Sequence, residues 1–357
     1  MDRLTCFPLT HDMMTILRYK ELLKDYKLAA VNSFKEDVFM EALAPVYPDC
    51  KMSSDIMDTF AEADTLLLLD NVEKYTWNKY QKLLEAARDS GRKILMSAKL
   101  YEEMRAENRV NTEDSASIEK LERIISEQER PKEKQFRTIS APVIAVTGMG
   151  EHCSKFETSL LTLKTLEERG YTVTFLSCNP LGMLFGGYTY PEYLYSDELS
   201  MEQKVWRLNQ DIAAHTEQEE TDVILAELPG GLMQLGEREK NHFSESALAV
   251  ANALDIDAGI LNVYVPFCKN TDQYAYLKDY CDYKYGIPVE KICMARQKAE
   301  YDSARNEYVF LHLDEAAYEK LYQKYCEPDI IRLTEQKAAE EAIGEVIKLL
   351  EENPEFV

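Results

Sequence analysis

The sequence predicts an α/β fold with a parallel sheet in each of two main domains, and three observations support this. Short apolar runs of strand length alternate with amphipathic helical stretches along most of the chain. The length of 357 residues suits two or three domains with room for a hydrophobic core. Hydrophobic residues make up 45% of the chain and aromatic residues 10%, which is typical of a globular protein rather than a disordered one.

The first domain is predicted over residues 1–110. Its expected helices lie at residues 13–24 and 78–90. Its expected strands, all short apolar runs, lie at residues 4–9, 28–32, 65–70 and 93–97. Strands separated by helices of this length are typical of parallel β-α-β units, so we expect a small Rossmann-like domain. The G-x-G-x-x-G pattern is missing, and we therefore infer no NAD binding from this domain.

A charged segment, residues 111–140, separates the two domains and contains no glycine. Its apolar residues Ile118, Leu121, Ile124 and Ile125 follow a helical period. This pattern predicts a helix over residues 114–129 that leads into a linker.

The second domain is predicted over residues 141–357. Its expected strands lie at residues 142–148, 171–177, 222–227 and 258–265. A helix is expected at residues 155–169, and an amphipathic helix at 335–352 follows the last strands. The order of strand, helix and strand again predicts a parallel sheet.

The charge and the cysteines argue against several classes of protein. Lys and Arg number 41 against 64 Asp and Glu, and the resulting net charge of −23 repels phosphate backbones and anionic lipid head groups. We therefore expect no nucleic-acid or membrane partner. The eight cysteines are dispersed, the first residues do not resemble a signal peptide, and no run of eighteen apolar residues occurs. These features predict a cytoplasmic protein.

The most informative motif lies at residues 146–158, between an expected strand and an expected helix. A phosphate-binding loop needs this context, because its backbone N–H groups, the positive end of the helix and a lysine all face the phosphates. Gly148 and Gly150 would let the backbone approach a ligand closely, and Lys155 would contact the outer phosphates. The candidate nucleotide-binding residues are Gly148, Met149, Gly150, Glu151, His152, Cys153, Ser154, Lys155, Thr158, Gly230 and Gly231.

The loop departs from the G-x-x-x-x-G-K-[ST] consensus at three points. Lys155 comes one residue late, Ser154 replaces the second glycine, and Phe156 replaces the hydroxyl residue that binds Mg²⁺. The spacing resembles the longer loop of P-loop proteins of the dethiobiotin-synthetase and cobyric-acid-synthase type. By that resemblance Gly148 is the first glycine, Ser154 the second and Lys155 the phosphate lysine. Thr158, on the same helix face, is the nearest replacement for the missing hydroxyl.

A second element strengthens this resemblance. Residues 222–232 form an apolar strand that ends in Glu227 and continues into a turn with Gly230 and Gly231. The same family has a strand that ends in Glu and is followed by a Gly-Gly turn near Mg²⁺ and the γ-phosphate. Because Mg²⁺ prefers carboxylate oxygens and retained waters, Glu227 is the candidate metal ligand, with Thr158 assisting. Lys155 and Glu227 are the candidate catalytic residues of this degenerate P-loop-type domain.

Several residues near the loop give weaker signals. His152 could donate to a phosphate, although an exposed loop residue is the simpler interpretation. Cys153 and Cys178 have no catalytic base beside them in the sequence and are interpreted as small buried hydrophobes. Asn179 lies where relatives often place an acid that activates water. An amide cannot be a base, which argues against rapid hydrolysis.

Two aromatic segments leave alternatives open. Residues 179–193 combine three glycines with apolar side chains, which fits a substrate lid or docking surface and equally a segment packed onto a neighbouring domain or subunit. Five tyrosines within residues 274–285 fit an interface, a ligand wall or an ordinary packed helix face.

The layout of the chain as a whole resembles a clostridial family of bacterial proteins described as peptide maturation system proteins. Together with the resemblance to dethiobiotin-synthetase-type P-loop proteins, this implies a protein that binds ATP, or another nucleotide, with Mg²⁺ and acts on a peptide or small carboxylate by ligase or kinase chemistry. The implied partners are a nucleotide, a precursor peptide or maturation enzymes, and a second copy of the chain in a homodimer. The alternative, favoured by Ser154 and Phe156, is a catalytically inactive P-loop-derived binding or scaffold protein of such a system.

Overall fold

The computed structural model divides the chain into two compact units. The first comprises Met1–Arg123 together with Met183–Gly186, and the second comprises Ile124–Gly182 and Gly187–Val357. The structure describes residues 1–34, 39–70, 77–110, 118–125, 136–237, 239–265, 271–326 and 330–352. Each unit is built on its own parallel sheet, which confirms the predicted α/β fold class.

The first unit contains a six-stranded parallel sheet with the strand order β3-β2-β1-β4-β5-β6. Its strands are β1 (Asp2–Phe7), β2 (Tyr26–Asn32), β3 (Lys51–Ser53), β4 (Thr65–Leu68), β5 (Lys93–Met96) and β6 (Ile118–Lys120). Its helices are α1 (His11–Arg18), the short 3₁₀ helix η1 (Lys20–Leu22), α2 (Phe39–Leu43), α3 (Ile56–Phe60), α4 (Trp77–Asp89) and α5 (Ala98–Ala106). This order is that of the doubly wound Rossmann fold, in which the chain starts in the middle of the sheet and winds outward in both directions.

Burial explains why the apolar runs of this unit form strands. Leu66 and Leu68 on β4 are fully buried, and they pack in one core cluster with Phe7 of β1 and Tyr80 of α4. A central parallel strand is covered by helices on both faces, so its sequence is apolar without alternation.

The prediction of a helix over residues 114–129 is wrong for the part of this segment that the structure describes. Residues 118–120 form β6, which pairs in parallel with β5 through Ile94 and Ile118, and residues 121–125 form no helix. The apolar spacing of this segment fits a helix, but the open edge of β5 offers backbone hydrogen bonds that override the local pattern. Residues 111–117 and 126–135 lie outside the described residues.

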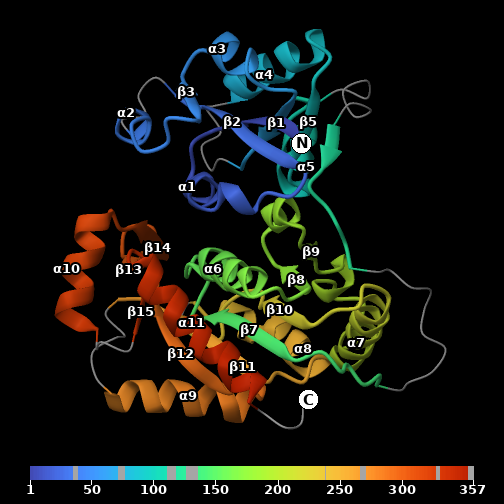
Figure 1. Cartoon of the computed structure of the whole chain (residues 1–357), viewed down its shortest axis with the longest axis vertical. Coiled ribbons are helices and arrows are strands. Elements are labelled where there is room, and N and C mark those ends of the chain that lie inside the picture. The colour runs from blue at the N-terminus through green and yellow to red at the C-terminus, as the bar shows by residue number, and fades with distance from the viewer. Residues whose placement is uncertain are drawn as a thin grey trace. The chain divides into compact units, whose positions relative to one another are not determined.

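The second unit is built on a seven-stranded parallel sheet with the order β15-β12-β11-β7-β10-β8-β9 (Figure 1). Its strands are β7 (Val143–Gly148), β8 (Val173–Ser177), β9 (Tyr188–Thr189), β10 (Val223–Glu227), β11 (Ala258–Val263), β12 (Val289–Met294) and β15 (Ile331–Arg332). Its α-helices are α6 (Lys155–Glu168), α7 (Met201–Gln218), α8 (Glu245–Ala253), α9 (Thr271–Tyr285), α10 (Glu315–Tyr325) and α11 (Gln336–Glu351). Its described residues also form the 3₁₀ segments η4 (Pro180–Phe185), η5 (Glu192–Leu194) and η6 (Asn241–Ser244).

The helices of the second unit cover both faces of its sheet. Helix α6 carries the chain from β7 to β8 and packs against α11, whereas α7 and α8 carry it back toward β11 and pack against each other. Because parallel crossovers are right-handed, these opposite directions place the two helix pairs on opposite faces. The central strand β7 is buried along its whole length, as its predicted apolar run requires.

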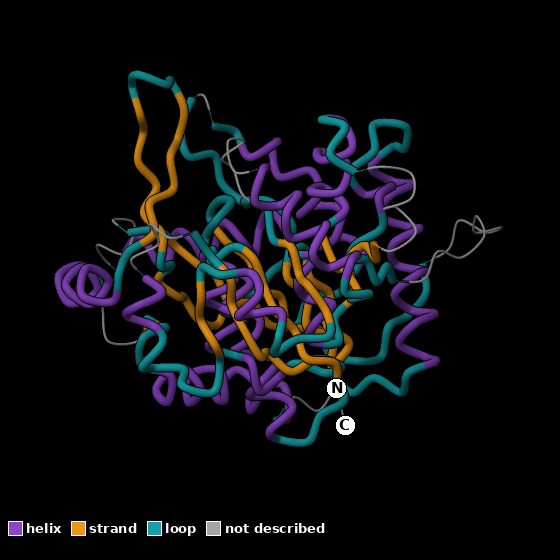
Figure 2. The backbone as a smooth tube through the Cα atoms, turned by 90° about the horizontal axis from the view of Figure 1, so that it is seen from above, coloured by secondary structure: helices purple, strands orange, loops and turns teal. Residues whose placement is uncertain are grey.

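One hairpin interrupts the parallel order. Strands β13 (Gln297–Asp302) and β14 (Glu307–His312) form an antiparallel pair of their own, which Figure 2 shows as two adjacent strands joined by a tight turn. The hairpin follows β12 directly, so its first residues start at the edge of the sheet where β7 and β10 also end.

Within the described residues, none of the helices combines the length and the apolar character that a membrane span requires.

Candidate functional site

Two loops meet at the edge of the second sheet where the central strands end. The glycine loop, residues 148–155, follows β7, and the carboxylate loop, residues 227–236, follows the neighbouring strand β10. The N–H groups of Leu232 and Met233 donate to the carbonyls of Gly148 and Met149, each at 3.0 Å. The structure therefore brings the two motifs of the sequence into direct contact.

Two glycines permit this contact. A Cβ atom on Gly231 would lie 2.3 Å from the Cα of Gly150, and a Cβ on Gly150 would lie 2.7 Å from the hydroxyl oxygen of Tyr264. Carbon atoms in contact normally lie about 3.5–4.0 Å apart, so a side chain at Gly231 would separate the loops, and one at Gly150 would displace the ring of Tyr264. Gly230 differs, because its φ is +67° and a Cβ atom built on it would meet no atom within 4 Å.

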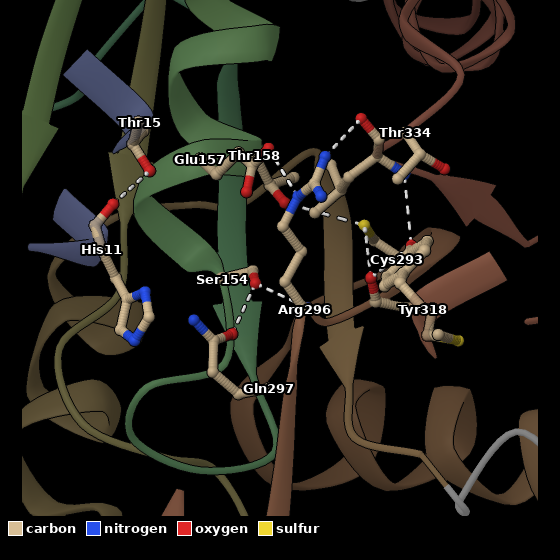
Figure 3. Close-up of polar contacts among 12 residues, drawn as sticks. His11, Thr15, Ser154, Glu157, Thr158, Cys293, Arg296, Gln297, Tyr318 and Thr334 are labelled. Atoms are coloured by element: carbon tan, nitrogen blue, oxygen red, sulfur yellow. Dashed lines mark hydrogen bonds and ion pairs between the residues drawn. The ribbon is translucent and has the colours of Figure 1, made fainter. Parts of the chain in front are cut away.

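Ser154 takes the backbone conformation that usually requires glycine. Its φ is 53°, and that of His152 is 51°, so two residues of the loop lie in the left-handed region. Turns of this kind point successive N–H groups inward and bind anions. The Ser154 hydroxyl donates to Oε1 of Gln297 at 2.6 Å and accepts from the N–H of Arg296 at 2.8 Å (Figure 3). These bonds offset the cost of the left-handed backbone, about 1–2 kcal/mol for a residue with a Cβ.

Lys155 is the first residue of α6, and its side chain reaches across to the carboxylate loop. The residue is only 7% exposed. Its ammonium donates to the carbonyl of Leu228 at 2.7 Å and to that of Gly230. These two partners are neutral, and an ammonium has three N–H donors. A buried cation is costly without an anion beside it, so a phosphate at this helix terminus would be stabilised by the charge of Lys155.

Glu227 ends β10 and is 2% exposed. Its Oε2 accepts a hydrogen bond from the hydroxyl of Ser177 at 2.7 Å, and its backbone carbonyl accepts one from Tyr190 at 3.1 Å. Burial, together with the nearby charge of Glu227, raises the pKa of the Cys178 thiol well above its ordinary value. The sequence did not single out Ser177 as a functional residue. Its position as the last residue of β8, at the edge where the site lies, is the signal that could have indicated it.

Thr158 lies on the other side of β7 from Glu227. Its hydroxyl is fully buried and donates to Oδ1 of Asn262 on β11 at 2.7 Å. The amide of Asn262 in turn donates to the carbonyl of Thr147 at 2.9 Å. The structure therefore does not bring the hydroxyl of Thr158 to the carboxylate of Glu227. Among the described residues, no group of three or more His, Cys, Asp and Glu could hold a metal ion.

The remaining residues of the glycine loop have different environments. Glu151 and His152 lie exposed at the tip of the loop, and the ring of His152 contacts that of Phe310 on β14, with centroids 5.1 Å apart. Met149 and Cys153 are buried. The Cys153 thiol donates to the carbonyl of Asn262 at 3.3 Å, and burial raises its pKa to about 12, which keeps it protonated near neutral pH.

A left-handed turn supports both loops. The four residues of η6 all have positive φ, from 47° at Asn241 to 62° at Ser244. The side-chain amide of Asn241 donates to the carbonyls of Met149 and Met233, one in each loop. Phe243, in the same turn, is 69% exposed. No feature of the sequence indicated this conformation.

The five tyrosines of residues 274–285 lie on α9. Tyr274 is buried, and the other four divide into two groups. Tyr280 and Tyr285 both donate to the carbonyl of Leu232 in the carboxylate loop, at 3.2 and 2.6 Å. Tyr276 and Tyr283 are exposed. Part of the cluster thus has a packing role beside the site.

The segment 179–193 is packed rather than open. The side chain of Asn179 accepts from the N–H of Leu181 at 3.0 Å and begins η4, and Leu184 and Phe185 are almost fully buried. Met183–Gly186 groups with the first unit. The role of this segment, as a lid or docking surface or as a packed segment, stays a prediction.

A buried ion pair lies beside the start of α6. Arg296 Nε donates to Oε1 of Glu157 at 3.0 Å, and both side chains are 6% exposed. The Arg296 guanidinium also donates to the carbonyl of Leu333 at 3.1 Å. Since Arg296 also bonds Ser154 through its backbone, it connects the glycine loop to the segment that follows β12.

Comparisons with known proteins support the fold. No protein-family model and no curated protein matches the sequence. Among solved structures, the chain is similar to a DUF1611 family protein from Anabaena variabilis, with a TM-score of 0.58 and 14% identity over 97% of this chain and 100% of that one. At this identity the similarity shows the fold alone.

Two further structures are more distant. One is a nucleotide-binding protein from Archaeoglobus fulgidus in complex with ADP, with a TM-score of 0.30 and 15% identity over 56% of this chain and 88% of that one. The other is a murein peptide ligase from Psychrobacter arcticus, with a TM-score of 0.28 and 10% identity over 97% of this chain and 65% of that one. Neither carries an argument at this distance, and the resemblance to peptide maturation proteins stays a prediction.

Proposed function

We propose that the second unit binds a nucleotide, ATP or a close analogue, with its phosphates on the glycine loop. The observation that carries the proposal is the buried ammonium of Lys155 at the start of α6, held by two neutral carbonyls. The left-handed backbone at His152 and Ser154 and the contact between Gly150 and Gly231 supply the shape of an anion-binding turn.

Mg²⁺ is part of the proposal, and the residues present fit it in part. Glu227 would hold the ion directly or through water. Thr158 would first have to leave its bond to Asn262, so its predicted role as a ligand is the weaker one. When bound, Mg²⁺ would neutralise charge on the phosphates.

The proposed chemistry is transfer of the γ-phosphoryl group of ATP to a peptide or small carboxylate, with ADP as the leaving group, as in a ligase or kinase. In such a reaction Lys155 would stabilise charge on the transferred phosphate, and the loop N–H groups would orient it. The peptide substrate, the maturation partners and a homodimer remain predictions from the family resemblance.

A second candidate is an inactive nucleotide-binding or scaffold protein. It is favoured by Phe156 at the position of the usual metal hydroxyl and by the engagement of Thr158 with Asn262. Both candidates share the phosphate site and differ in turnover.

Calorimetric titration of ATP, with and without Mg²⁺, tests the shared site. Lys155→Met removes the charge but keeps an unbranched side chain, and Lys348→Met is a matched control on the exposed face of α11. We expect the wild type and Lys348→Met to bind ATP equally and Lys155→Met to lose at least about tenfold in affinity. Equal affinity in all three proteins would overturn the proposal. Release of phosphate in the presence of candidate peptides then separates the enzyme from the scaffold.

A further inference from the structure

Ser177 makes two hydrogen bonds that fix the direction of its hydroxyl proton. The residue ends β8 and is fully buried. The backbone N–H of Asn179 donates to Ser177 Oγ at 3.1 Å, which uses the oxygen as an acceptor. The single hydroxyl proton is then directed to Oε2 of Glu227 at 2.7 Å.

Gly182 fixes the position of the Ser177 side chain. A Cβ atom built on Gly182 would lie 2.4 Å from the Cβ of Ser177 and 2.8 Å from its Oγ. The backbone of the 3₁₀ segment η4 therefore lies directly against Ser177 and leaves its hydroxyl little room to turn. An oxygen held in this way is a fixed donor rather than a mobile one.

The fixed donor orients the carboxylate of Glu227. Ser177 holds Oε2 of Glu227, and the Cys178 thiol also hydrogen-bonds this carboxylate. A carboxylate has about four acceptor sites, so Glu227 keeps acceptor capacity for a cation. The carbonyl of Leu228, the residue after Glu227, accepts from the ammonium of Lys155. At the end of β10, the Ser177 hydroxyl thus holds the Glu227 side chain, and the Lys155 ammonium holds the backbone of the next residue.

We propose that Ser177 is a positioning residue that holds Glu227 toward a divalent cation carried in with a nucleotide. The proposal rests on the proposed function, because the cation arrives with the phosphates on the glycine loop. Hydrogen bonds to the carboxylates and imidazoles that bind metals commonly contribute 10–100-fold to metal affinity, so the effect is measurable without turnover.

The test compares two variants that each remove one buried hydroxyl from β8. Ser177→Ala removes the donor to Glu227. Thr174→Val removes a hydroxyl that bonds Thr221 at 2.7 Å, three residues earlier on the same strand. ATP affinity is measured by calorimetry with Mg²⁺ and again with EDTA, and thermal unfolding confirms that each variant is folded.

The measured quantity is the ratio of ATP affinities with and without Mg²⁺. We expect Ser177→Ala to lower this ratio by about tenfold or more, with little change in the EDTA value, and Thr174→Val to leave the ratio unchanged. A ratio in Ser177→Ala equal to that of the wild type overturns the inference and leaves the proposed function standing. Absence of ATP binding by the wild type overturns both.

Discussion

The contact between the two loops predicts very different losses of stability for alanine substitutions at two adjacent glycines. In Gly231→Ala the new methyl carbon starts 2.3 Å from the Cα of Gly150. Restoring a separation of about 3.5 Å requires the loops to move apart by roughly 1.2 Å. Overpacking of this kind costs about 1–3 kcal/mol, and weakening the hydrogen bonds of Leu232 and Met233 to the glycine loop adds about 1 kcal/mol each. We therefore expect Gly231→Ala to lower the free energy of unfolding by roughly 3–5 kcal/mol.

Gly230→Ala is the matched control. Its methyl group meets open space, and only the φ of +67° opposes the change. The left-handed backbone costs about 1–2 kcal/mol for alanine, and the less flexible unfolded chain returns about 0.4–1 kcal/mol. We expect Gly230→Ala to lower the free energy of unfolding by less than about 1.6 kcal/mol.

Urea unfolding followed by circular dichroism measures both values, and ATP calorimetry shows whether the loop geometry survives. Equal stability of the two variants would refute the reasoning, because the close contact between the loops would then cost nothing to disturb. A Gly231→Ala protein that is stable and still binds ATP with wild-type affinity would refute it as well.

Three further predictions concern other parts of the second unit. Glu157→Gln leaves Arg296 buried without its anion and should destabilise the protein by about 3–5 kcal/mol in urea; a loss below about 1 kcal/mol would show that the pair is solvated. Phe243→Gly should raise the stability by about 0.5–1 kcal/mol, because glycine relieves a φ of 53° and the lost side chain is mostly exposed; a lower melting temperature would contradict the left-handed turn. Burial raises the pKa of Cys153 from its ordinary value of 9.0 to about 12, so its contribution to stability is present below pH 9 and lost as the pH rises toward 12. Cys153→Ala should therefore reduce the fall in the free energy of unfolding above pH 9, measured by urea unfolding, by about 1.4 kcal/mol per pH unit, and an unchanged slope would argue against a buried thiol.

Local sequence predicted the parts of the fold that depend on local pattern. The expected strands at residues 142–148 and 222–227 and the helix that starts at Lys155 agree with β7, β10 and α6. Buried central strands and strand-to-helix turns have strong signals, because apolar runs and glycine placement follow directly from burial and backbone geometry.

The features that sequence reasoning missed depend on contacts between distant residues. Strand β6 forms because β5 offers an edge, and Ser177 acquires its role only when β8 and β10 lie side by side. Asn262 forms hydrogen bonds with both Thr147 and Thr158. A single asparagine in an apolar run does not predict which residues it will bond. The candidate site was therefore predictable as two motifs, but not as the network of hydroxyl and amide groups that surrounds them.

The long-range hydrogen bonds of Ser154 and Lys155 determine when the glycine loop can assemble during synthesis. Lys155 bonds a carbonyl 73 residues further along the chain, and Ser154 bonds a side chain 143 residues further along. Contacts of such long range form late in folding, because the intervening chain must first be ordered. During synthesis, the glycine loop therefore stays incomplete until Gln297 has emerged and docked, so a chain that stops short of the β13–β14 hairpin carries the loop sequence without the assembled loop.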